Sequence, residues 1–254
     1  MFKFNFFYIS KIRATWMLYL IGIYPLLIFL AELLNSNFLS LSATHKNSVS
    51  FLELFIAIYD TQQKAMLSLI IIGYLSSLLF YSEISTGRLL FYKDQSRYKI
   101  FNSKLTSIIS SYFIFLSILL LSTLVVYLFY VNNHEYSSHS FMLNNSELNH
   151  TLILNLLGIF LTDLFLIFYV VIFSVKFNSG ITIISMILCY VVIKITDNIN
   201  KIKFFPSNFI NLDTDKSFIF NLSIMSSITI VYIFIIYLLA ITIFRKFNFK
   251  FHLI

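Results

Sequence analysis

The chain has 254 residues, of which 59% are hydrophobic, 19% aromatic and 11% charged. Soluble domains carry about 25% charged and about 45–50% apolar residues, so this composition excludes an ordinary soluble protein and indicates a membrane protein. The net charge of +7 does not indicate a nucleic-acid partner, because the Lys and Arg residues flank apolar runs and form no basic stripe. We expect a single helical membrane domain over residues 1–254.

Residues 1–15 combine aromatic side chains, such as Phe4 and Phe7, with the basic Lys3, Lys11 and Arg13. A short basic and aromatic segment before a span is typical of a helix that lies in the membrane interface. We therefore predict an N-terminal interfacial helix. The alternative is a plain positive flank that only sets the topology.

Six apolar runs have the length of a membrane span or come close to it, and none alternates as a β-barrel strand would. They cover about Trp16–Leu34, Ala65–Ser82, Ser107–Val131, Thr151–Ser174, Ile181–Ile195 and Leu222–Phe244. The first has no small-residue cleavage site at its end, so we expect it to remain as a span. The sequence predicts an all-α integral membrane protein with six transmembrane helices.

Two segments between spans are not plain loops. Residues 51–59 are apolar enough to begin a helix that leads into the second span. Residues 197–221 are too polar to span and too apolar for a free loop, so we expect a re-entrant or interfacial helical pair broken at Pro206.

The basic residues predict the orientation. With the N-terminus inside, the cytoplasmic side holds twelve of the eighteen Lys and Arg residues. The loop over residues 133–149 holds none. Both termini are therefore expected in the cytoplasm and that loop outside the cell.

A polar block at residues 83–104 separates the second and third apolar runs, and we expect it to form a cytoplasmic loop. It contains five basic residues, namely Arg88, Lys93, Arg97, Lys99 and Lys104. A basic loop held between two spans is available to bind a cytoplasmic partner.

No motif predicts catalysis or a cofactor. There is no P-loop to bind a nucleotide, no HExxH and no Gly-x-Ser-x-Gly, so we do not expect this chain to be an enzyme. A group of polar residues in the third outer loop has no zinc-ligand spacing, so exposed loop residues are the simpler interpretation. That group consists of His134, Glu135, His139, Glu147 and His150.

Asp163 is the one acidic residue well inside an apolar run. A charge at that depth is costly and often marks a transport path or a proton relay. The other interpretation is a buried Asp that is hydrogen-bonded between helices, close to Thr162. Both remain open from the sequence, and the first would make the protein a proton-coupled carrier.

The polar block resembles the first cytoplasmic loop of ABC-2-type permeases, the membrane subunits of many bacterial ATP-driven exporters. The matching residues are Glu83, Gly87, Leu89-Leu90, Ser96-Arg97, Ile100 and Lys104. The Pro that often precedes the Ser-Arg pair is absent, and the Gly-to-Arg spacing is slightly short. The six spans, the basic N-terminal segment and the semi-apolar last outer loop extend the resemblance over the whole chain.

The resemblance implies a permease of the bacterial cell membrane that works with two copies of a separate ATPase and with a second permease, identical or related. ATP would be bound by the ATPase, which would dock on a coupling helix in the block. The implied interface residues are Glu83, Gly87, Arg88, Lys93, Asp94, Arg97, Lys99 and Lys104. In general appearance the chain is similar to exporters of amphipathic peptides, such as the staphylococcal phenol-soluble modulin exporter. A lipid or drug as cargo is the alternative within the family.

Overall fold

The computed structural model describes residues 1–34, 49–89, 94–143, 145–197, 204–209 and 218–246. All regular structure in these ranges is helical, and the only strand-like contact among them is an isolated bridge between Val49 and Ser137. The prediction of an all-α protein is therefore confirmed.

The N-terminal part forms three α-helices and a 3-10 helix in the place of the predicted interfacial segment and first span. Helix α1 (Phe2–Ser10) is followed by α2 (Arg13–Gly22), the 3-10 helix η1 (Tyr24–Leu26) and α3 (Leu27–Leu33). The chain bends by 50° between α2 and the η1–α3 segment. Pro25 in η1 has no backbone N–H to donate, which explains why a regular helix ends here. The segment that the sequence predicted as one continuous span is thus bent.

The second predicted span is preceded by a helix, as the apolar residues 51–59 suggested. Helix α4 (Phe51–Ala65) leads into α5 (Leu67–Leu79) and then α6 (Tyr81–Ser85). Met66 joins α4 to α5 in a left-handed backbone conformation, with φ 57°. A non-glycine residue in this conformation interrupts the helical ladder, so α4 and α5 are separate rods.

The later helices extend beyond the predicted spans at both ends, except that α7 ends two residues before the predicted end of its span. They are α7 (Arg97–Phe129), α8 (Ser146–Lys176), α9 (Ser179–Asp197) and α10 (Phe218–Lys246), with short 3-10 helices η4 (Val131–Asn133) and η5 (Pro206–Phe209). Helix α7 begins ten residues before the predicted third span. Hydropathy locates the apolar part of a helix, whereas polar residues can prolong the same helix into water. In the segment between α9 and α10 the described residues include η5, and residues 198–203 and 210–217 lie outside the described part of the chain.

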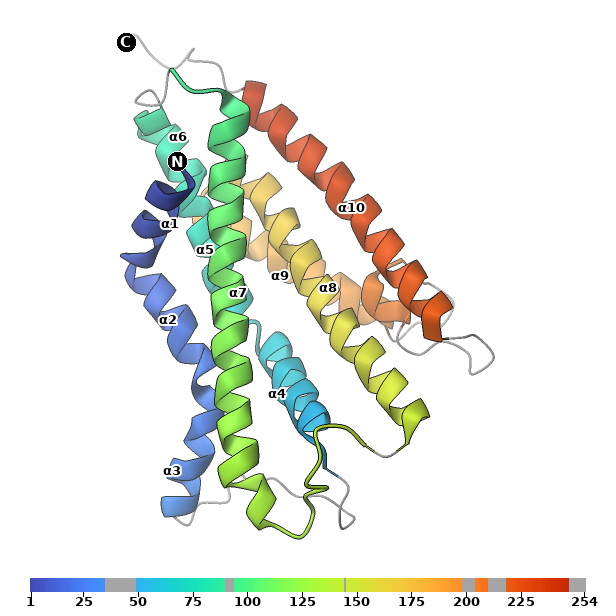
Figure 1. The fold of residues 1–254 in the computed structure, drawn as a ribbon. Helices are drawn as coiled ribbons and strands as arrows, with labels where there is room; N and C mark the ends of the chain where they lie inside the picture. Colours follow the sequence, from blue (N-terminus) through green and yellow to red (C-terminus); the bar gives the residue numbers. More distant parts are fainter. Residues whose placement is uncertain (35–48, 90–93, 144, 198–203, 210–217, 247–254) are drawn as a thin grey trace.

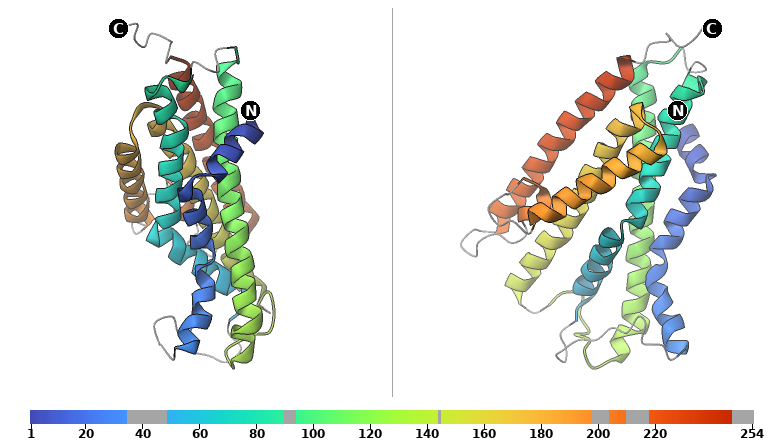
Figure 2. Two further views of the ribbon diagram at one scale, coloured as in Figure 1. Left: turned by 90° about the vertical axis from the view of Figure 1, so that its left-hand side faces the viewer. Right: turned by 180° about the vertical axis from the view of Figure 1, so that it is seen from behind.

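Five helices of the described chain are long and apolar enough to cross a membrane, and the bent α2–α3 segment makes a sixth if it is one span. Five crossing helices agree with a multi-pass membrane protein. The helices run along one another as a tilted bundle, in which α4 and α5 follow the long α7, and α8 and α9 lie behind it (Figures 1 and 2).

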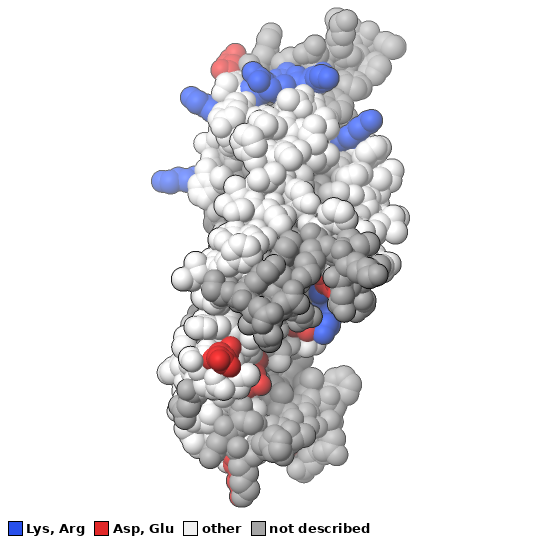
Figure 3. All heavy atoms as spheres, turned by 90° about the vertical axis from the view of Figure 1, so that its right-hand side faces the viewer, with Lys and Arg blue, Asp and Glu red and all other residues white. Residues whose placement is uncertain are grey.

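Charge is distributed unevenly between the two ends of this bundle. Basic residues occupy α1, the start of α2, the α6–α7 connection and the ends of α8 and α10, which all lie at one end (Figure 1). Acidic residues are more frequent toward the other end, and Figure 3 shows this separation on one face. At the basic end the described acidic residues are Glu83 and Asp94. This distribution is what a membrane protein with one cytoplasmic end shows.

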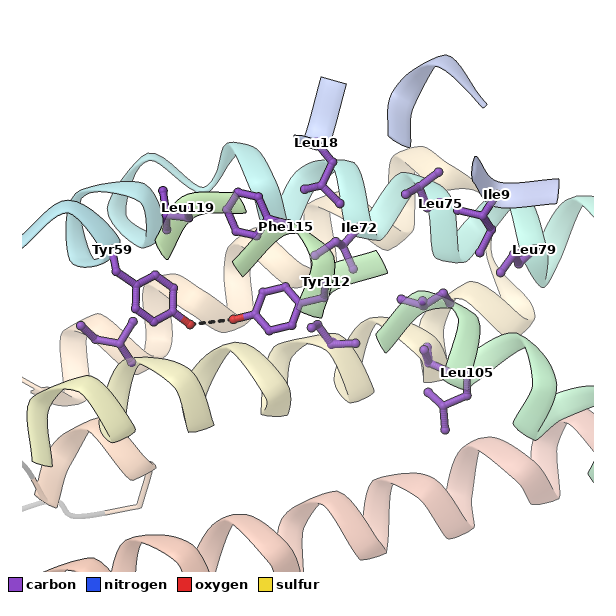
Figure 4. Close-up of a cluster of buried hydrophobic side chains, with 14 of the residues drawn as sticks. Ile9, Leu18, Tyr59, Ile72, Leu75, Leu79, Leu105, Tyr112, Phe115 and Leu119 are labelled. Carbon is purple, nitrogen blue, oxygen red and sulfur yellow. Dashed lines mark hydrogen bonds between the residues drawn. The ribbon is translucent and has the colours of Figure 1, made fainter. Parts of the chain in front are cut away.

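The core connects the N-terminal helices with α5 and α7. Ile9 of α1, Leu18 of α2, Ile72 of α5 and Phe115 of α7 are buried in one cluster (Figure 4). The α2 and α7 backbones approach closely at Gly22, where an added Cβ would lie 3.2 Å from the Phe115 carbonyl oxygen. Small residues permit such contacts between helices in a membrane, where apolar burial alone does not drive association.

Candidate functional site

The block at residues 83–104 forms the connection between α6 and α7 at the basic end of the bundle (Figure 1). It is more helical than the predicted loop, because Glu83 belongs to α6 and residues 97–104 form the first two turns of α7. The residues between α6 and α7 are 86–96, of which 90–93 lie outside the described part of the chain. Lys93 lies outside the described residues.

Glu83 and Lys104 form a buried ion pair. The Lys104 Nζ lies 2.6 Å from the Glu83 Oε2, and it also donates a hydrogen bond of 2.5 Å to the Leu79 carbonyl oxygen. Lys104 is 0% exposed and Glu83 is 6% exposed. The pair thus fastens the start of α7 to the α5–α6 junction. The sequence placed both residues in the ATPase interface and did not indicate that they bind each other.

Gly87 ends α6 in the left-handed conformation, with φ 71°. Its N–H donates to the Ile84 carbonyl oxygen at 3.2 Å. A glycine adopts this angle without the steric penalty that a Cβ brings, and such a residue commonly terminates a helix. The left-handed backbone conformation therefore explains why a glycine occupies position 87.

The remaining charged residues of the block differ in their exposure. Arg88, Asp94 and Lys99 are exposed, whereas Arg97 is half-buried. Mobile charged side chains at the end of a bundle can form ion pairs with a partner, and such rim pairs contribute to orientation and association rate more than to affinity. Arg88, Asp94 and Lys99 are thus the exposed charged residues among the described part of the block, and a partner can reach them directly.

Helix α1 lies beside the first turns of α7. The buried Asn5 donates a hydrogen bond from its Nδ2 to the Ser103 Oγ at 2.7 Å. On the opposite side of α1, Phe4 and Phe7 are about 60% exposed, and the Lys11 Nζ lies 4.3 Å from the Phe7 ring centroid. A helix with one polar anchor and an exposed aromatic and basic face suits a membrane interface.

A second polar site surrounds Asp163, which is 2% exposed near the middle of α8. Its Oδ2 lies 2.9 Å from the Tyr59 hydroxyl and 2.7 Å from the Tyr112 hydroxyl. Its Oδ1 accepts a hydrogen bond of 2.8 Å from the Gln63 Nε2. Thr162 donates to the Gly158 carbonyl oxygen instead. Asp163 is therefore a hydrogen-bonded junction of α4, α7 and α8.

The sequence singled out Asp163 but missed its three partners. Tyr59 and Gln63 are four residues apart, so they lie on the same face of α4. That spacing was a weak signal, since many tyrosines occur in this chain, and nothing in the sequence pairs Tyr112 with either residue. One sequence signal could have located the site. Gln63 is a polar side chain placed just before the apolar run that continues into α5.

Asp163 lies level with the end of α9 that is distant from the basic end. Two residues along α8, the Phe165 ring lies 5.7 Å from the Phe205 ring. The Phe205 N–H donates to the Asn208 side chain, which in turn donates to the Asp197 carboxylate at 2.8 Å. Because Asp197 ends α9, the carboxyl of Asp163 is near one end of that span and away from its centre.

The polar group in the loop after α7 does not form a metal site in the described residues, where no three candidate ligands gather. The His134 Nδ1 lies 2.9 Å from the Tyr130 carbonyl oxygen, and the ring stacks on Tyr136. His150 stacks on Phe218 instead. The histidines therefore have local contacts that account for their positions.

The comparisons with known proteins found no relative of this chain. No family model, no curated protein and no solved structure matches it.

Proposed function

We propose that this chain is the permease subunit of an ATP-driven exporter that resembles the ABC-2 type. The observation that carries the proposal is the basic end of the bundle, where α1, the Gly87 turn and the first turns of α7 lie together. A P-loop is absent from the sequence, so a separate ATPase would supply the energy. This end would face the cytoplasm.

Coupling would depend on two kinds of residue in the block. Arg88, Asp94 and Lys99 are exposed and would form ion pairs with the ATPase. Glu83 and Lys104 are bonded to each other, so they would act indirectly by holding α6 against α7. Movement of the docked ATPase would then be passed to the long α7.

The complete transporter would contain two permeases and two ATPases. Many large apolar side chains of α9 and α10 are exposed, among them Leu188, Phe234 and Leu238, which is compatible with lipid or a second permease against these helices. Amphipathic peptides are the proposed cargo, because their apolar face suits a path bordered by aromatic side chains. Lipids or drugs are the alternative cargo.

The experiment is copurification of the tagged full-length chain with a co-expressed cassette ATPase of the same organism, followed by measurement of cargo export. We expect the double variant Arg88→Glu/Lys99→Glu to insert normally, to retain less ATPase and to export less. Lys64→Glu is the matched control for a charge reversal outside the block, because Lys64 is 64% exposed and lies in the last turn of α4. Normal docking and export in the double variant would contradict the coupling role.

A proton-coupled carrier is the second candidate function, favoured by the buried carboxyl of Asp163. It predicts export that stops in a protonophore while ATP is maintained. It also predicts export that continues with a hydrolysis-dead ATPase. The ATP-driven exporter predicts the reverse in both assays, so the two candidates are distinguished by the same pair of measurements.

A further inference from the structure

Three oxygen atoms around Asp163 form a closed triangle. The hydroxyls of Tyr59 and Tyr112 are 2.6 Å apart, and the Asp163 Oδ2 lies 2.9 Å and 2.7 Å from them. The contact between the two tyrosines is drawn in Figure 4. All three distances are in the range of O–H···O hydrogen bonds.

Three such contacts require three protons, but the two phenols supply only two. If Asp163 were ionised and both phenols donated to it, the two phenol oxygens would face each other lone pair to lone pair. That contact is the shortest of the three, at 2.6 Å. A proton on the Asp163 Oδ2 removes the conflict, because each oxygen then donates one hydrogen bond and accepts one around the ring.

The other carboxyl oxygen behaves as a carbonyl. The Asp163 Oδ1 accepts from the Gln63 Nε2, which is the bond that a neutral acid still makes there. On the neighbouring helices the Tyr190 phenol of α9 faces Asp163, and the charged groups that act on Asp163 or on Tyr190 are Lys194 and Asp197 on α9 and Asp60 on α4. Lys194 pairs with Asp197, and Asp60 pairs with Lys64. An ionised carboxylate in this buried place would be costly, and protonation avoids that cost.

We propose that Asp163 is a proton-binding site, and that its neutral carboxyl completes the hydrogen-bond ring which fastens α4 to α7 and α8. The proton is held on Oδ2. The ring adds to the apolar packing of α4, whose connection to α5 is interrupted by the left-handed residue Met66. The proposal concerns only the protonation of the Asp163 carboxyl. It therefore does not depend on the proposed transport function.

The test is infrared difference spectroscopy on the full-length protein in lipid at neutral pH, native against Asp163→Asn. A protonated acid absorbs in the carbonyl-stretch region above the carboxylate bands, and its band moves down in D2O. We expect the variant to lose one such D2O-sensitive band. Loss of a carboxylate band instead, with no change in the protonated region, would overturn the proposal.

A second variant covers the case in which Asp163→Asn does not fold. Gln63→Met removes the donor to Oδ1 and leaves the ring intact. The protonated-carbonyl band should then move to higher frequency, because the C=O loses a hydrogen bond. Gln62→Met is the control, since Gln62 is also buried on α4 and makes no described bond to Asp163. An unshifted band in Gln63→Met, or the absence of any protonated band, would refute the assignment.

Discussion

Removal of Lys104 alone should destabilise the protein strongly, because its charge is the partner of a buried carboxylate. In Lys104→Met, Glu83 would stay 6% exposed and lose the ammonium at 2.6 Å. Breaking a buried pair by removing one partner costs about 3–5 kcal/mol. Met fills a similar volume, so the loss would arise from charge and hydrogen bonding and only slightly from packing.

Removal of both charges should be far less harmful. Replacement of a buried ion pair by apolar residues of similar volume is often neutral or stabilising by about 1–4 kcal/mol. We therefore expect Glu83→Met/Lys104→Met to be within about 1 kcal/mol of the native protein or more stable. The exposed Lys99 provides the matched control on the same helix, and Lys99→Met should change stability by less than about 0.5 kcal/mol.

The assay is reversible unfolding in mixed micelles, with the free energy of unfolding measured for the native protein, both single variants and the double variant. The coupling energy between positions 83 and 104 follows from the double-mutant cycle. A loss below about 1 kcal/mol in Lys104→Met, or a double variant less stable than Lys104→Met, would refute the buried-pair reasoning.

Four further predictions concern other parts of the chain. Gly87→Ala should destabilise the protein by about 1–2 kcal/mol, because residue 87 has a left-handed backbone conformation. Gly180→Ala is the control in the same unfolding assay. It should be neutral or stabilising, because an added Cβ there would have no neighbour nearer than 3.8 Å. The orientation can be tested in a cysteine-free background by replacing one exposed residue at a time, Ser146 or Asp94, with cysteine. The cysteine at position 146 should react with an impermeant thiol reagent added outside the cell, and the cysteine at position 94 should not. The opposite labelling would reverse the proposed orientation. Export should survive a protonophore, and Asp163→Asn should reduce it less than Arg88→Glu/Lys99→Glu does, because the amide keeps most hydrogen bonds of a neutral acid. Asp163→Leu should accelerate amide hydrogen exchange in the last two turns of α4 by roughly 100-fold, from the loss of three hydrogen bonds of about 1 kcal/mol each; equal acceleration throughout the bundle would contradict a local clasp.

The spans could be predicted from the sequence because a bilayer demands long apolar runs, and each of the later runs coincides with one observed helix, to within two residues at the end of α7. The ends could not, since α7 continues through the polar residues 97–104 without a change in helical geometry. The bend after α2 and the break at Met66 were also missed. Hydropathy is averaged over many residues and therefore does not reveal a bend or a break at one residue. A methionine also does not indicate a left-handed backbone conformation.

The candidate sites were predicted in part for similar reasons. Gly87 was identifiable because glycine at a helix end has a specific backbone meaning. The Glu83–Lys104 pair was not, because the two residues are 21 apart in sequence and the folded arrangement alone brings them together. Asp163 was conspicuous as a lone charge, whereas its tyrosine partners resembled the many aromatic residues that pack or face lipid.

Helix α7 connects the two sites physically. It is continuous from Arg97 to Phe129, and Lys104 and Tyr112 on it are eight residues apart, a rise of about 12 Å. A displacement of its first turns by a docked partner would therefore move Tyr112 with them. Helix α4 is joined to α5 through the left-handed Met66, and it contacts α7 through the ring around Asp163 and through apolar packing such as that of Phe51 on Tyr127. The ring is thus the point where relative motion of α4 and α7 would have to break or keep hydrogen bonds.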